Sequence, residues 1–283
     1  MLNILKMDWF RMIKMKSTWI LWIAMAAMLL FSTVMMSEEF LNPAQIAANQ
    51  EAIEEYEQSS GAPNIGMTVT IPTKPGEQAT VYDLFFANVQ GKAIALFLVI
   101  FAVLFATADI RSGYIKNIGG QIGNRAFLIF SKTVILFAFT ALTFFIALLV
   151  QAVSNLISFR YLEWGDFQEL AVYFGTQVML HFAFALIVIG LSIVISNNVI
   201  SMALAICLCM NLTMLLYGAI NSLTEKLIGE SVNVIPYTVT GQISGIQMQL
   251  TGEEIGRAVI VSFVYGVVAV FVGSLVFKKR DIR

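Results

Sequence analysis

The sequence predicts an all-α membrane protein with six transmembrane helices. Of its 283 residues, 58% are hydrophobic and 12% are charged, and that charged share is about half of what a soluble domain carries. Several apolar stretches reach the roughly 20 residues that a helix needs to cross a bilayer. All five prolines lie between those stretches, which keeps the expected helices unbroken. The longest polar interval has about 55 residues, so we treat 1–283 as one transmembrane domain.

Residues 1–16 are expected to form a helix in the membrane interface. Its apolar face consists of Leu2, Leu5, Trp9, Met12 and Ile13, and its opposite face of Asn3, Lys6, Arg11 and Lys14. A tryptophan facing the lipid and cations facing the headgroups are typical of interfacial helices. The alternative is a plain cytoplasmic lead-in whose cations only fix the topology.

The six expected spans follow the apolar stretches. They cover residues 19–36, 89–108, 126–150, 171–195, 199–220 and 258–277. The second is the shortest, because only 16 residues separate Lys92 from Asp109. Its helix must therefore begin before Lys92 or lie in a thinned part of the bilayer.

Two longer polar segments are expected on the outer side. In 37–91, Asn42 and Pro43 predict the start of a helix that ends near Ser59, and the stretches MTVTI and QATVY around Pro75-Gly76 predict a small hairpin. The segment fits either a peptide-contacting lid or a solvated connector. In 221–257, we expect a re-entrant or interfacial helix pair near 243–250.

The cations predict the orientation of the chain. With the N-terminus inside, twelve of the 17 Lys and Arg fall in cytoplasmic segments, as the positive-inside rule requires. Fifteen of the 18 Asp and Glu then fall outside. An even number of spans places both termini in the cytoplasm.

The segment 109–125, between the second and third spans, combines cations with four glycines. Its cations can steer an acidic partner, and glycines on both sides of YIKNI allow sharp turns. The simpler alternative is a connector that only obeys the positive-inside rule. A nucleotide loop of the Walker type is excluded, because the one Gly-Lys pair, Gly91-Lys92, has Phe86 where the first glycine is needed.

The pattern D-x-R-x-G-x-I-K-N in this segment, followed by an Arg at the start of the third span, resembles permease subunits of type-2 ABC exporters. The chain is most similar to the bacterial group that exports, or confers immunity to, antimicrobial and amphipathic peptides. Tyr114 departs from the pattern, since many relatives have a small Thr there. The resemblance implies that this segment is an ATPase-coupling helix. The residues that match are Asp109, Arg111, Gly113, Ile115, Lys116, Asn117 and Arg125.

The resemblance also implies partners and a site for the substrate. Two cytoplasmic ATPase subunits would hold ATP and Mg, while this chain would bind no cofactor or metal and would not be an enzyme. A second copy or a similar permease, surrounded by membrane lipid, would complete the bacterial plasma-membrane complex, with no role for nucleic acid. By depth in the spans, the candidates to face the substrate cavity are Gln151, Asn155, Gln177 and Asn211. The alternative function is a non-transporting immunity or sensor protein that binds peptide through 37–91.

Few ionisable side chains are expected inside the spans, which argues against proton coupling. Lys132 is near the cytoplasmic edge and is expected to snorkel, while His181 is expected to be a neutral packing residue. Cys207 and Cys209 point to different helix faces, so neither a disulfide nor a metal site is expected there. In the last span, small residues at helical spacing predict close packing against the fifth span or a second permease. They are Ser262, Gly266, Ala269 and Gly273.

Overall fold

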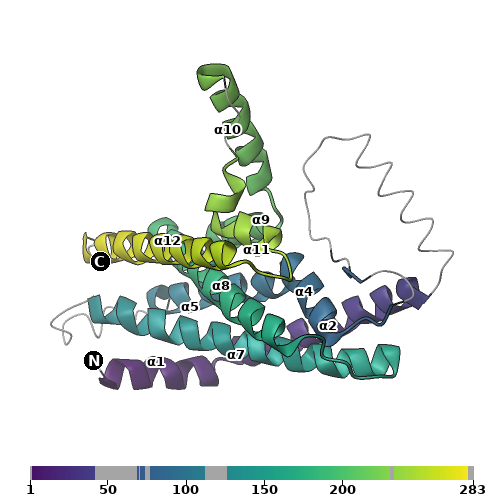
Figure 1. Ribbon diagram of the computed structural model, residues 1–283. Helices are drawn as coiled ribbons and strands as arrows, with labels where there is room; N and C mark the ends of the chain where they lie inside the picture. Colours follow the sequence, from purple (N-terminus) through teal and green to yellow (C-terminus); the bar gives the residue numbers. More distant parts are fainter. Residues whose placement is uncertain are drawn as a thin grey trace.

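The computed structural model describes residues 2–41, 69, 71–73, 77–111, 126–229 and 233–279. Within these ranges the chain is helical and has no strand, which confirms the all-α class. The long helices form an elongated bundle, and the first turn of α1 lies at the same end of it as the last turn of α12 (Figure 1). The helices are α1 (Leu2–Lys14), α2 (Lys16–Leu41), α4 (Val81–Gln90), α5 (Ala93–Arg111), α7 (Ala126–Phe159), α8 (Phe167–Ile195), α9 (Asn198–Cys209), α10 (Thr213–Ile228), α11 (Val239–Gly245) and α12 (Gly252–Lys279), with a 3-10 turn, η1, at Ile235–Tyr237.

Four helices, α2, α7, α8 and α12, are each long and apolar enough to cross a membrane, and six spans result if each of two bent pairs counts as one. In these pairs α4 meets α5 at 53° and α9 meets α10 at 67°. The second and fifth spans were expected as continuous helices, so that expectation is corrected. The described spans also extend beyond the expected bounds, because polar residues at their ends continue the helices.

The expected strand QATVY is wrong. Val81 and Tyr82 instead begin α4, because Thr80 caps that helix: its hydroxyl accepts a hydrogen bond from the backbone N–H of Asp83 at 3.2 Å, and the Asp83 carboxylate accepts one from the N–H of Thr80 at 2.7 Å. This reciprocal capping box satisfies two backbone donors and outweighs the β propensity of a Val-Tyr pair. Pro75-Gly76 and the helix expected from Asn42 lie outside the described residues.

Aromatic contacts join α2, α5 and α7. The ring of Phe139 lies between those of Trp22 and Phe101, stacked at centroid distances of 5.5 and 3.5 Å. The indole N–H of Trp22 donates to the hydroxyl of Thr143 at 2.9 Å, so this polar group is satisfied inside the bundle. These contacts hold the first three spans together.

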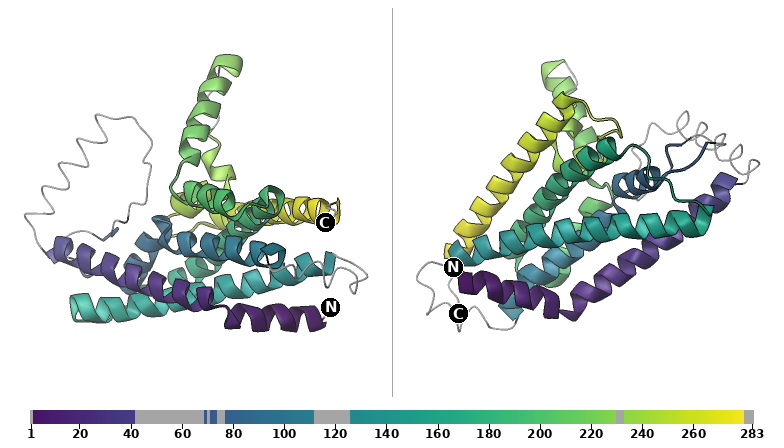
Figure 2. Two further views of the ribbon diagram at one scale, coloured as in Figure 1. Left: turned by 180° about the vertical axis from the view of Figure 1, so that it is seen from behind. Right: turned by 60° about the horizontal axis from the view of Figure 1, so that its bottom comes forward.

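The small residues of α12 pack against α8. Gly266 lies against Leu186, and Ala269 lies against Gly190. The close approach predicted for this stripe is therefore present, but its partner is the fourth span rather than the fifth. The reason is the break in the fifth span, which turns α10 away from the bundle (Figure 2).

We expect Gly190→Leu to destabilise the protein strongly and Gly175→Leu to leave its stability nearly unchanged. A Cβ at Gly190 would lie 3.3 Å from the carbonyl oxygen of Ala269, whereas one at Gly175, on the same helix, meets nothing within 4 Å. A leucine at 190 must push α8 and α12 apart, at a cost of about 1–3 kcal/mol. Thermal unfolding in detergent measures the difference, and equal midpoints for the two variants would contradict this packing.

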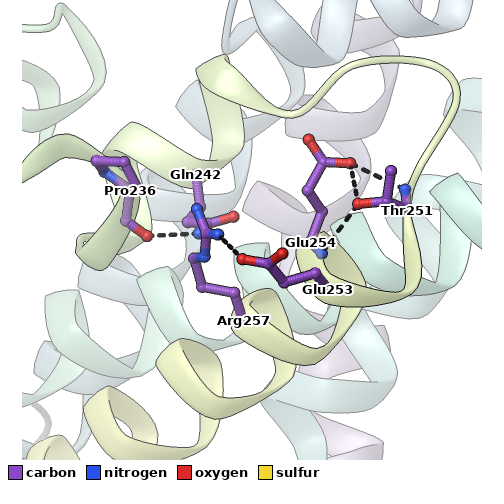
Figure 3. Close-up of polar contacts among 6 residues, drawn as sticks. All are labelled: Pro236, Gln242, Thr251, Glu253, Glu254 and Arg257. Carbon is purple, nitrogen blue, oxygen red and sulfur yellow. Dashed lines mark hydrogen bonds and ion pairs between the residues drawn. The ribbon is translucent and has the colours of Figure 1, made fainter.

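We call residues 233–257 the α11 cap, because α11 packs against α8 and α4. η1 and α11 lead into α12, which begins with a second capping box between Thr251 and Glu254, and the guanidinium of Arg257 pairs with Glu253 at 2.6 Å (Figure 3). The helix pair expected near 243–250 is corrected: α11 ends at Gly245, and 246–251 are not helical.

Candidate functional site

The residues expected to couple to an ATPase are described only in part. Asp109 and Arg111 lie in the last turn of α5, and α7 begins at Ala126. The other five residues of this set lie outside the described residues: Gly113, Ile115, Lys116, Asn117 and Arg125. Their role as a coupling segment stays a prediction.

Three of the four residues expected to face a substrate cavity lie buried between helices. The amide N–H groups of Gln151, Asn155 and Gln177 donate to the Thr33 hydroxyl at 3.4 Å, the Ala79 carbonyl at 2.9 Å and the Ile243 carbonyl at 3.4 Å, respectively. Their side-chain oxygens are buried without a hydrogen-bond partner among the described residues. In this arrangement the three amides link α7 to α2, α7 to the segment before α4, and α8 to α11.

The fourth candidate, Asn211, meets a buried cation. Lys92 is 1% exposed, and its Nζ donates to Oδ1 of Asn211. Lys92 lies in the break between α4 and α5, and Asn211 lies in the break between α9 and α10. The two interrupted spans therefore touch where their helices are broken.

The backbone at both contacts is unusual. Lys92 has φ of 60° and Asn211 has φ of 57°, which is the left-handed region that residues other than glycine rarely adopt. Such conformations cost of order 1 kcal/mol or more and persist where the surroundings enforce them. Asparagine is among the residues that tolerate this region best, whereas lysine is not. The break at Lys92 is thus maintained at an energetic cost.

A second hydrogen bond ties α5 to α9 at their other ends. The hydroxyl of Thr107, near the end of α5, donates to Oδ1 of Asn198, the first residue of α9, at 2.8 Å. Together with the bond from Lys92 to Asn211, it fixes the two antiparallel helices at both ends. α5 and α9 are therefore tied to each other at both ends.

His181 and Cys209 lie within electrostatic range of Lys92. Nδ1 of His181 is 2.9 Å from the carbonyl oxygen of Gln177; because a carbonyl only accepts, Nδ1 carries the proton and Nε2 is left as an acceptor. The ring packs edge-on against Phe144 at 4.7 Å. His181 is thus a packing residue as predicted, but beside a cation that was not predicted. Cys207 is exposed, and Cys209 is a buried free thiol.

Sequence reasoning missed the role of Lys92 because it treated the second expected span, 89–108, as one unbroken helix. The sequence signal was present, since Gly91-Lys92 separates two apolar runs that are each too short to span a membrane. A glycine and a charged residue at that point are consistent with an interrupted span. Burial of the lysine depends on α9 and α10, which are remote in sequence.

A second buried polar cluster fixes α1 to α7. The hydroxyl of Ser131 donates to the carboxylate of Asp8 at 2.6 Å, and Nζ of Lys132 donates to the carbonyl of Phe105 at 3.3 Å. Lys132 also lies over the ring of Phe105 at 4.5 Å. The expectation that Lys132 snorkels is therefore corrected: this side chain points into the bundle and is buried.

The side chains of α1 divide between a face buried in the bundle and an exposed face. Asp8 and Met12 are buried, while Trp9 and Ile13, which were expected on the same face as Met12, are exposed, as is Phe10. Asp8, which was assigned to neither face, is buried against its hydrogen-bond partner on α7. The exposed aromatic residues remain available to lipid, as in an interfacial helix.

No protein-family model matches this chain, and no curated protein matches it. The fold itself defines the class: the apolar helices make the chain a multi-pass helical membrane protein. Within it, the described residues bring one constellation of polar groups together from three spans, namely Lys92, His181 and Asn211. We call this the break junction.

Proposed function

We propose that this chain is the membrane subunit of an ATP-driven exporter of the ABC type, which moves amphipathic peptides or lipid-like compounds out of a bacterial cell. The observation that carries the proposal is the break junction. Interrupted spans whose broken ends bind a substrate are known from secondary transporters, so the break junction supports transport but not a particular energy source. The resemblance of 109–125 to a coupling helix supports an ATPase as the energy source.

The geometry offers a path from that segment to the break junction. α5 runs without interruption from Ala93, next to Lys92, to Arg111 at the start of the segment. ATP binding would close two ATPase subunits and displace 109–125, and α5 would transmit this displacement as a rigid rod. Because α9 is tied to α5 at both ends, Asn211 would move with it. In this proposal both termini and 109–125 face the cytoplasm.

We expect the chain alone to neither bind nor hydrolyse ATP, because no phosphate loop exists in its sequence. Co-expressed with an ABC ATPase encoded in a neighbouring reading frame, it should form a stable complex that hydrolyses ATP. Size-exclusion chromatography and phosphate release measure both properties. ATP hydrolysis by a homogeneous preparation of the chain, or no complex with such an ATPase, would refute the proposal.

A further inference from the structure

The break junction holds a positive charge without an acidic partner. Lys92 is 1% exposed, and Asn211 is the hydrogen-bond partner of its Nζ. No carboxylate of the described residues pairs with Lys92. A buried ammonium that has only a neutral partner is costly. In a span, an ionisable residue of this kind indicates a functional site rather than packing.

The surroundings of Lys92 favour an anion over other ligands. α5 begins at the next residue, and the N-terminus of a helix carries a partial positive charge. His181, within electrostatic range, has its proton on Nδ1 and adds no negative charge. α4 ends at Gln90, so the negative end of its dipole lies at the same break and offsets the positive end of α5. The charge of Lys92 is therefore what favours an anion.

We propose that the break junction binds a carboxylate carried by a largely apolar molecule. Asn211 occupies the position of that ligand, because its planar amide presents Oδ1 to the ammonium as a carboxylate oxygen would. A carboxylate makes a charge-assisted hydrogen bond, which is stronger than the bond to a neutral amide. The ligand would therefore displace Asn211 from Lys92.

The environment of His181 sets the apolar character of the ligand. The ring of Phe144 contacts His181, and it also contacts those of Phe85 and Phe174 at 6.0 and 5.9 Å. Such a wall accepts apolar and aromatic groups and excludes highly charged ones. A peptide with a free C-terminus and a fatty acid share the required chemistry, one carboxylate on an apolar chain.

The proposal rests on the proposed function only for its biological role, because binding needs no ATPase. The purified full chain in phosphatidylcholine nanodiscs is titrated with a dansyl-labelled apolar peptide ending in a carboxylate and with the same peptide ending in a carboxamide. Palmitate and palmitamide, used as competitors, form the second arm. We expect the acid of at least one pair to bind about tenfold tighter than its amide.

Two variants test the residues without removing the break. Lys92→Asn keeps a residue that tolerates positive φ but removes the charge, and it should abolish the preference for the acid. Asn211→Gly also tolerates positive φ and removes the competing oxygen, so it should strengthen binding of the acid several-fold. Lys132→Gln, at a buried lysine outside the break junction, is the matched control and should keep the preference.

The outcomes separate the two proposals. A preference confined to palmitate identifies a fatty acid as the ligand, and a preference confined to the peptide identifies a peptide carboxylate. Equal binding of acid and amide in both pairs, or a preference that survives in a correctly folded Lys92→Asn, would overturn the carboxylate site and leave the exporter proposal intact. A Lys92-dependent preference in a chain that associates with no ATPase would support the site and refute the exporter.

Discussion

The double substitution Arg111→Glu with Lys116→Glu is expected to reduce co-purification of the ATPase to about a tenth or less of the wild-type level. The proposed coupling segment presents these cations to a partner, and placing like charges together at an interface costs several kcal/mol, of which about 1.4 kcal/mol is a tenfold loss of affinity. Export should fall in parallel.

The matched control reverses two cations elsewhere in the cytoplasmic set. Lys278→Glu with Lys279→Glu removes the same charge from the C-terminal end of the chain, so it affects the positive-inside rule equally. It should retain the ATPase. If 109–125 is a connector that only fixes topology, both double substitutions should instead retain the ATPase to the same degree.

Correct insertion must be checked for each variant. Single cysteines at Ser59 and Ser112, in a background without Cys207 and Cys209, should react differently with an impermeant maleimide in intact cells. The first should be labelled and the second should be protected. If the charge-reversed protein passes this check and still retains its ATPase and full export, 109–125 is a connector, and the argument for an ATPase as the energy source is lost.

Hydropathy predicted the spans because membrane crossing depends on local composition alone. The apolar stretches of 126–150 and 171–195 lie within α7 and α8, and α7 extends further at its C-terminal end and α8 at its N-terminal end. The small residues of the last span likewise predicted a close helix contact. Choosing α8 as the partner required the position of α10, which depends on how the fifth span breaks.

The remaining differences arise from contacts between segments remote in sequence. Lys92 and Asn211 both have a strained backbone conformation, and their side chains are hydrogen-bonded to each other. The carboxylate of Asp8 is buried because the hydroxyl of Ser131 donates to it. A hydropathy scale treats each charge as exposed and therefore places all such residues at the surface. The start of α4 is different, because the capping pair Thr80 and Asp83 is present in the sequence, but the prediction followed the strand propensity of Val81 instead.

The α11 cap provides the sharpest steric prediction. Gly241→Ala is expected to lower the thermal stability markedly, whereas Gly245→Ala, on the same helix, should be neutral. A Cβ at Gly241 would lie 2.7 Å from the hydroxyl oxygen of Thr238 and closer still to the carbonyl oxygen of Ile235. A Cβ at Gly245 meets nothing within 4 Å, and alanine favours the helix.

The clash at Gly241 reaches the bundle through hydrogen bonds. Thr238 caps α11 by accepting from the N–H of Gly241 at 3.2 Å, and its own hydroxyl donates to the Ile235 carbonyl at 2.9 Å. If these contacts of Thr238 open, α11 is displaced. The carbonyl of Ile243 in α11 accepts a hydrogen bond from the side chain of Gln177 in α8, so α8 is affected as well. Overpacking of this kind costs about 1–3 kcal/mol. Thermal unfolding in detergent compares the variants. Equal midpoints for the two alanine variants would show that α11 shifts freely and does not stabilise α8.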